Sequence, residues 1–179
     1  FRADQCGSLI RPPSLRAARA DFLREKITAA ELEKIENECI LSALKMQQGA
    51  GLQIYSDGEC RRDFWRSADS DAFYEGMENE GIDFTRHPYL KDKDIKDPEQ
   101  YVPPNPVVKG KLARKKRITG KEIAFLKANA PGEFKITIPS PVTLSRASFR
   151  PGITDRVYPT WQALFDDYVT LLSEEISAI

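Results

Sequence analysis

The residues best suited to chemistry follow a short apolar run that ends at Tyr55. There, Asp57 and Glu59 flank Gly58 and two arginines come next. In α/β proteins, the loop after a buried strand commonly carries binding and catalytic groups. Two neighbouring carboxylates could transfer protons as an acid and base pair, or could hold a cationic group. This stretch therefore predicts one edge of a binding site.

A second candidate lies near the start of the chain, at Gly7 and Ser8. A glycine followed by a small hydroxyl residue lets the backbone turn with its amides exposed. Such amides can bind a carboxylate or a phosphate. On local sequence alone, an ordinary turn that leads into Arg11-Pro12-Pro13 is the favoured interpretation.

Composition limits the classes of partner. The 179 residues include 27 basic and 27 acidic side chains, so no net charge favours nucleic acid or an anionic membrane. The basic run from Lys109 to Lys121 lacks interleaved aromatics and is interpreted as solvated surface. No apolar run approaches the roughly 18 residues that span a bilayer. We therefore expect one domain with neither nucleic acid nor a membrane as partner.

The cysteines and the histidine do not predict a metal site. Cys6, Cys39 and Cys60 are odd in number and far apart, so they indicate no disulfide framework and fit a reducing, cytoplasmic setting. His87 is the only histidine and has no cysteine at a ligand-like spacing. We expect this chain on its own to bind no metal.

Helix signals occur in three places. Thr28 with Glu31, and Thr119 with Glu122, have the spacing of capping boxes. A third helix is expected from Pro159 onward. The predicted helices cover residues 28–48, 119–130 and 159–179.

Strands are expected at 52–55, 107–112 and 134–138, and the first residues begin extended. The last of these strands breaks at Pro139-Ser140-Pro141, and 142–158 is expected to be a loop. The segment 63–106 has no clear period and is expected to be a long irregular excursion, of the kind that serves as a lid or binding loop.

Strands and helices thus alternate, which favours a parallel sheet with helical crossovers. No glycine-rich dinucleotide or Walker sequence is present, so the barrel is favoured over the open sheet. We predict an α/β fold of the (β/α)₈ TIM-barrel type. Because a complete barrel takes about 250 residues, residues 1–179 should supply the first four β/α units, the N-terminal half of one barrel domain.

Three motifs carry a resemblance to a known family: RADQCGSLIRP at 2–12, IYSDGECRR at 54–62 and KITIPSP at 135–141. Together they resemble the first half of the catalytic barrel of the cobalamin-independent methionine synthase family. Within that family they are most similar to the short, single-barrel members that include epoxyalkane:coenzyme M transferase-like proteins.

This resemblance implies a zinc-dependent transfer of a methyl or alkyl group to a thiol. It places Gly7 and Ser8 on a substrate carboxylate, and Glu59 on a substrate cation or another hydrogen-bond donor of the substrate. Asp57 is also implied at the site. For this residue a structural role is favoured, in which its carboxylate bonds loop amides or the following arginines, Arg61 and Arg62. Ser140 would line the same mouth, and no catalytic residue is identified.

Two departures from the family pattern matter. Gln5 stands where many relatives have a histidine. The family's zinc ligands lie in the second half of the barrel, so zinc is expected only in the complete barrel. The other half would come from a continuation, a second chain or self-association. A folate is compatible with the resemblance but is not implied by it.

Two other functions remain open. One is a lyase or decarboxylase on a related barrel, in which Asp57 or Glu59 would act as the acid without zinc. The other is a non-catalytic half-barrel that serves as a structural or regulatory subunit.

Overall fold

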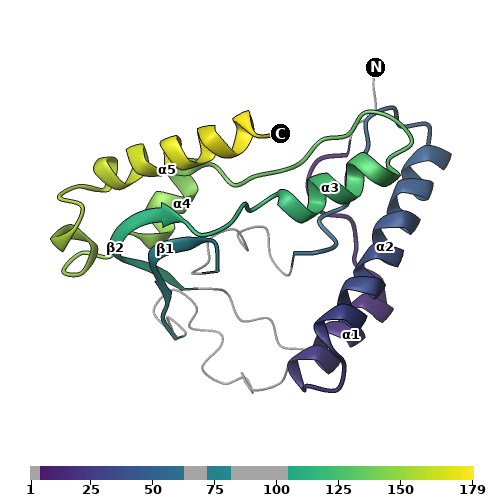
Figure 1. Ribbon diagram of the computed structural model, residues 1–179, viewed down its shortest axis with the longest axis horizontal. Helices are drawn as coiled ribbons and strands as arrows, with labels where there is room; N and C mark the ends of the chain where they lie inside the picture. The colour runs from purple at the N-terminus through teal and green to yellow at the C-terminus, as the bar shows by residue number, and fades with distance from the viewer. Residues whose placement is uncertain (1–4, 63–71, 82–104) are drawn as a thin grey trace. The chain divides into compact units, whose positions relative to one another are not determined.

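A computed structural model describes residues 5–62, 72–81 and 105–179 (Figure 1). The described residues fall into two compact units, each with its own core. The first unit contains residues 5–62 and 121–137, and the second contains 72–81, 105–120 and 138–179.

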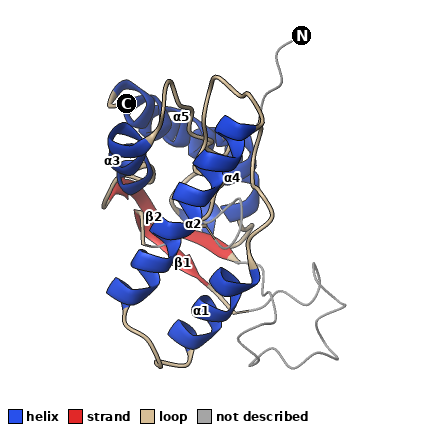
Figure 2. Cartoon of the chain, turned by 90° about the vertical axis from the view of Figure 1, so that its right-hand side faces the viewer, coloured by secondary structure: helices blue, strands red, loops and turns tan. Residues whose placement is uncertain are grey.

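The first unit is built on two packed helices, α1 (Pro13–Leu23) and α2 (Ala29–Gly49), which lie side by side in Figures 1 and 2. The predicted capping box of α2 is confirmed: the Glu31 N–H donates to Thr28 Oγ1 at 3.2 Å, and the Thr28 N–H donates to Glu31 Oε2 at 2.7 Å. Helix α1 was not predicted. It begins with proline in its first turn and ends before Arg24.

Two of the predicted strands meet in this unit at a single parallel bridge between Tyr55 and Phe134. The Tyr55 N–H donates to Glu133 O and the Lys135 N–H donates to Tyr55 O, both at 2.9 Å. The core below this bridge is formed by apolar residues of α1, α2, α3 (Gly120–Asn129) and the turn after Tyr55. Its buried members are Leu15, Ile40, Leu44, Tyr55, Cys60 and Leu126.

The capping box predicted at Thr119 is corrected by the structure. Helix α3 begins at Gly120, as the spacing suggested, but the Thr119 hydroxyl donates to Glu175. The Glu122 carboxylate instead lies beside Arg62. Spacing alone cannot distinguish a capping pair from two polar side chains that have tertiary partners.

In the second unit, β1 (Tyr74–Asn79) pairs antiparallel with β2 (Pro106–Arg114), with a bulge between Glu75 and Met77 (red in Figure 2). The sequence placed a strand correctly at 107–112 but assigned it to a parallel sheet. Its partner comes from the stretch that was expected to be irregular. The predicted parallel arrangement is therefore wrong for β2 among the described residues.

Helices α4 (Pro141–Ser148) and α5 (Trp161–Ser177) complete the second unit, with a short 3₁₀ turn at Thr154–Arg156 between them. Residues 142–158 were expected to form a loop. Ser140 caps α4 and Pro141 opens it, so the residues that end the preceding extended segment also start a helix. The core contains Tyr74, Met77, Val108, Leu112, Leu144, Leu164, Tyr168 and Leu172.

Together the described residues form a mixed α/β protein. None of the helices in these ranges combines the length and the apolar character that crossing a bilayer would require.

Candidate functional site

The turn at residues 56–62 is fixed to the end of α2 by one buried side chain. Gln47 Nε2 donates to Ser56 O at 2.8 Å, and the Ser56 N–H donates to Gln47 Oε1 at 3.0 Å. The amide of Gln47 thus pairs with the backbone as a neighbouring strand would. The turn therefore leaves the Tyr55 bridge in a defined direction.

Two consecutive residues of the turn adopt left-handed backbone conformations, Gly58 with a φ of 64° and Glu59 with a φ of 55°. A Cβ at Gly58 would lie 2.9 Å from Leu9 Cδ1, which is the end of a flexible side chain, so it is the positive φ that favours glycine here. For Glu59 this conformation is unfavourable and needs support. Asp57 provides part of it, because Asp57 Oδ1 accepts the Glu59 N–H at 3.0 Å.

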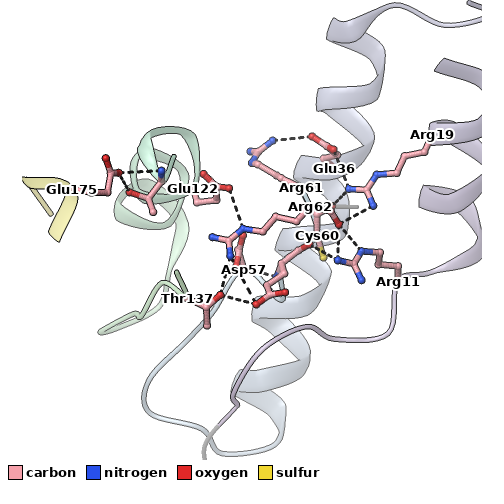
Figure 3. A network of polar contacts seen from close by, with 12 residues as sticks. Arg11, Arg19, Glu36, Asp57, Cys60, Arg61, Arg62, Glu122, Thr137 and Glu175 are labelled. Carbon is pink, nitrogen blue, oxygen red and sulfur yellow. Dashed lines mark hydrogen bonds and ion pairs between the residues drawn. The ribbon is translucent and has the colours of Figure 1, made fainter. Parts of the chain in front are cut away.

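Two arginines hold the other side of the turn through its carbonyl groups (Figure 3). Arg11 donates to the carbonyl oxygens of Arg62, at 2.9 Å from Nε, and Glu59, at 3.1 Å from Nη2. Arg19 donates to Cys60 O at 2.6 Å and Arg62 O at 3.2 Å. Arg19 Nη2 also lies 3.4 Å from Glu36 Oε1, so Arg19 joins α1, α2 and the turn.

Arg61 points toward α2, away from the other charged groups of the turn (Figure 3). Its Nη1 lies 3.4 Å from Glu36 Oε2, and its Nη2 donates to Asn37 Oδ1. The guanidinium also stacks over the Phe125 ring, 5.1 Å from the centroid. Arg61 therefore anchors the turn to α2 and α3.

Arg62 and Thr137 make the polar centre of the site. Thr137 Oγ1 donates to Glu59 Oε1 at 2.7 Å and accepts from Arg62 Nη1 at 3.1 Å. Arg62 Nη1 lies 3.9 Å from Glu59 Oε1, and Arg62 Nε lies 3.7 Å from Glu122 Oε1. One guanidinium thus lies between two carboxylates from different elements.

These charged groups are buried, with 5% of Glu59, 8% of Arg62 and 7% of Glu122 exposed. Burial raises the pKa of Glu122, and the positive charges of Arg62 and Arg61 only partly oppose this. Burial likewise raises the pKa of Asp57, which is 3% exposed. Within the described residues Asp57 Oδ2 has no hydrogen-bond partner. Burial therefore disfavours the charged forms of Asp57 and Glu122 in the folded protein.

The cysteines offer little as ligands or nucleophiles. Burial raises the pKa of the Cys60 thiol to about 11, so it is protonated at neutral pH. Cys6 is exposed and lies 4.0 Å from Lys135 Nζ. In the ranges that the structure describes, no three His, Cys, Asp or Glu side chains are grouped so that they could hold a metal ion. The described residues therefore do not fit a zinc centre.

Four of the five predicted site residues lie in the first unit. The Leu9 N–H donates to Gly58 O at 3.0 Å, which brings the segment with Gly7 and Ser8 alongside the turn with Asp57 and Glu59. Gly7 has a φ of 75°, and Ser8 is exposed.

The remaining residues singled out in the sequence have other surroundings. Ser140 belongs to the second unit, where its Oγ accepts the Thr143 N–H at 3.2 Å as the cap of α4. Gln5 Nε2 donates to the backbone oxygens of Cys6 and Gly7, both at 3.4 Å. His87 lies outside the described residues.

Sequence reasoning missed Gln47, Arg62, Thr137 and Glu122 as parts of this site. Arg62 and Thr137 lie in the motifs at 54–62 and 135–141, so the sequence could have indicated them as site residues. Glu122 was assigned to a helix cap because of its spacing, and Gln47 lies within the predicted helix 28–48 without a role of its own. Only tertiary structure brings these two to the turn.

No family model matches the chain, but comparison with known proteins finds several similar sequences and structures. The uncharacterized proteins YxjG and YxjH of Bacillus subtilis are 42% identical over 65 residues and 33% identical over 117 residues. These alignments cover 36% and 51% of the chain. A 5-methyltetrahydropteroyltriglutamate–homocysteine methyltransferase of Candida albicans is 28% identical over 149 residues, or 83% of the chain.

The chain spans only 17%, 30% and 18% of the lengths of these three relatives. A solved structure from Listeria monocytogenes, described as a vitamin B12-independent methionine synthase, matches 93% of the chain and 49% of its own length. Its TM-score is 0.60 at 26% identity. A B12-independent methionine synthase from Shewanella sp. W3-18-1, in complex with selenomethionine, matches 85% of the chain and 40% of its own, with a TM-score of 0.62 at 22% identity.

Proposed function

Because the chain belongs to the cobalamin-independent methionine synthase family, we propose that it is the substrate-holding half of a methyl- or alkyltransferase that acts on a thiol. In this proposal it supplies the first four β/α units of a (β/α)₈ barrel. The parallel bridge between Tyr55 and Phe134 supports this, because each of its two segments follows a helix. The antiparallel pair of β1 and β2 would be an addition to the barrel.

The observation that carries the proposal is the close association of two segments suited to the two ends of an amino acid. The Leu9–Gly58 hydrogen bond holds the Gly7–Ser8 turn against the turn that carries Glu59. Exposed backbone amides suit a carboxylate, and a buried carboxylate suits an ammonium group. The substrate class would thus be an α-amino-acid thiol, such as the homocysteine that the Candida albicans relative is named for.

In this proposal Glu59 binds the substrate ammonium group and Gly7 with Ser8 binds the carboxylate. Asp57 holds the turn by accepting the Glu59 N–H. Binding both ends of the amino acid would fix the direction in which its thiol points, which brings the reacting atoms together.

In this proposal the zinc ligands lie outside this chain; within residues 5–62, 72–81 and 105–179, no three His, Cys, Asp or Glu side chains are grouped to hold a metal ion. The complete assembly would consist of this chain and the segment, second chain or second copy that completes the barrel. A cytoplasmic location is also proposed, supported by the three free cysteines.

The test is thiol binding by the complete assembly, measured calorimetrically with L-homocysteine under reducing conditions, together with its zinc content. Glu59→Gln should weaken binding about 30- to 100-fold, because a charge-assisted hydrogen bond is lost from a buried site. Glu38→Gln, at an exposed position on α2, should leave binding unchanged. Absence of L-homocysteine binding by the wild-type assembly would contradict an amino-acid thiol as substrate.

A further inference from the structure

We infer that Glu122 is a positioning residue that binds Arg62 and thereby keeps the Glu59 carboxylate able to accept a cationic group. The inference deepens the proposed function and rests on it for the identity of that group. It assigns a role to a residue whose sequence spacing suggested only a helix cap.

Arg62 lies close to the carboxylates of both Glu122 and Glu59. Arg62 Nε lies 3.7 Å from Glu122 Oε1, and Arg62 Nη1 lies 3.9 Å from Glu59 Oε1. The two carboxylates therefore face different nitrogens of one guanidinium at nearly equal distances. Figure 3 shows Arg62 lying between the labelled Glu122 and Thr137.

Thr137 separates Arg62 from Glu59. Its hydroxyl accepts from Arg62 Nη1 at 3.1 Å and donates to Glu59 Oε1 at 2.7 Å. Arg62 thus reaches Glu59 through a hydroxyl rather than by a direct hydrogen bond. Within the described residues, the contacts of the Glu59 carboxylate with Thr137 and Arg62 both use Oε1, and in this inference Oε2 binds the cation.

The charge on Glu122 affects how strongly Arg62 attracts Glu59. Charges interact strongly in a buried site, because the effective dielectric constant is low. If Glu122 carried no charge, the whole charge of Arg62 would act on Glu59, and Arg62 would compete with any ammonium group for that carboxylate. When Glu122 is ionised, its negative charge offsets part of the attraction between Arg62 and Glu59. Arg62 then competes less strongly with an ammonium group for the Glu59 carboxylate.

Other charged groups surround this guanidinium. Arg62 lies 3.9 Å from Glu59 and 3.7 Å from Glu122, and its positive charge also partly offsets the rise that burial causes in the pKa of the Asp57 carboxyl group. Of the neighbouring arginines, Arg19 and Arg61 both make ion pairs with Glu36, and Arg11 and Arg19 donate to carbonyls of the turn. Burial raises the pKa values of Asp57 and Glu122, and a cation bound beside Glu59 would favour the charged forms of these carboxyl groups.

The experiment compares two probes on the complete assembly by calorimetry: L-homocysteine, and 4-mercaptobutyrate, which lacks only the ammonium group. Glu122→Gln should weaken L-homocysteine binding about five- to tenfold and change 4-mercaptobutyrate binding less than about twofold. Glu122→Asp, which keeps the charge, should restore most of the loss. A general distortion of the site would weaken both probes alike and would overturn the inference.

Two further variants sharpen this test. Glu33→Gln removes the ion pair of Glu33 with Lys121, which also joins α2 to α3 but lies at the surface, and should affect neither probe. In the double variant Arg62→Gln/Glu122→Gln the competing charge is gone. L-Homocysteine should therefore bind more tightly than to Glu122→Gln alone, and a further loss would contradict the role assigned to Arg62.

A second readout does not need a ligand. With carboxyl-¹³C glutamate in this chain, the Glu59 signal should move in Glu122→Gln and stay in place in Glu33→Gln. If neither probe binds the wild type but this signal moves, the proposed substrate is wrong and the electrostatic link from Glu122 to Glu59 stands. If the signal does not move, the inference fails whatever the probes do.

Discussion

At the scale of single residues, Asp57 is the side chain whose environment fits its charge least well. One carboxylate oxygen accepts the Glu59 N–H, while the other is buried without a partner among the described residues. A structural role through loop amides was the role favoured from the sequence, and this hydrogen bond agrees with it. The unpaired oxygen shows that the structural role has an energetic cost.

That cost predicts a particular pH dependence. Burial raises the pKa of Asp57 above its ordinary value of 3.8, so the folded protein binds more protons than the unfolded chain just above that value. The stabilising contribution of protonated Asp57 is complete below pH 3.8 and is lost as the pH rises through the folded-state pKa. Asp57→Asn should therefore gain stability relative to the wild type as the pH rises toward neutrality.

Urea unfolding across the acidic to neutral range measures this difference. Asp166→Asn, an exposed carboxylate on α5, serves as the control and should change stability little at any pH. A difference between Asp57→Asn and the wild type that stays constant with pH would show that Asp57 is not desolvated in the folded protein.

The thiols give a second prediction at this scale. Cys60 is buried and its pKa is raised to about 11, whereas Cys6 is exposed. Because the thiolate is the reactive form, iodoacetamide near neutral pH should label Cys6 well before Cys60. Peptide mass spectrometry of a time course would show the order. Equal labelling rates for Cys6 and Cys60 in the folded protein would contradict the buried position of Cys60.

At the scale of elements, the parts of the fold that the sequence predicted are those with local signals. The capping box at Thr28 and the apolar stripe after it identified α2, and the stripe from Trp161 identified α5. Helix α1 lacks both signals, because its cap is Pro12 and no side chain caps it. Helix α4 was hidden by Pro139-Ser140-Pro141, which both ends an extended segment and begins a helix.

The β structure shows what local signals cannot provide. Residues 107–112 are strand-like in sequence, but nothing in them specifies an antiparallel partner at Tyr74–Asn79. The pairing depends on residues more than 20 positions away. The same limit applied to the site: Asp57 and Glu59 were found from their spacing, whereas Glu122 required the tertiary contact with Arg62.

Gln47 links α2 to the site, and its removal tests how the turn is held. Gln47→Leu keeps the volume roughly but leaves the buried N–H and C=O of Ser56 without their partners. We expect a loss of about 2–4 kcal/mol in the free energy of unfolding, since each unpaired buried polar group costs roughly 1–3 kcal/mol. Gln48→Leu, at the exposed neighbouring position, should change it by less than about 0.5 kcal/mol.

Chemical denaturation of the two variants gives this comparison directly. Similar small effects for both would mean that the backbone of Ser56 finds other partners, and that Gln47 does not determine the direction of the turn.

At the scale of the whole molecule, the described residues contain two cores, one in each unit. The first unit contributes the amino-acid-binding residues of the proposal. The relatives are several times longer than the matched region, with 17% to 30% of their lengths covered. The proposed function thus belongs to an assembly in which this chain supplies the substrate-holding side and the zinc ligands lie elsewhere.

This division of roles predicts how substrate recognition depends on the rest of the assembly. Glu59, Thr137, Arg62 and Glu122 all belong to the first unit, so their mutual contacts do not require the zinc-bearing half. Removing zinc with a chelator should therefore weaken binding of L-homocysteine but leave the ratio of its affinities for wild type and Glu122→Gln nearly unchanged. If zinc removal abolished that ratio, the ammonium site would depend on the metal-bearing half, and the two roles would not be separable.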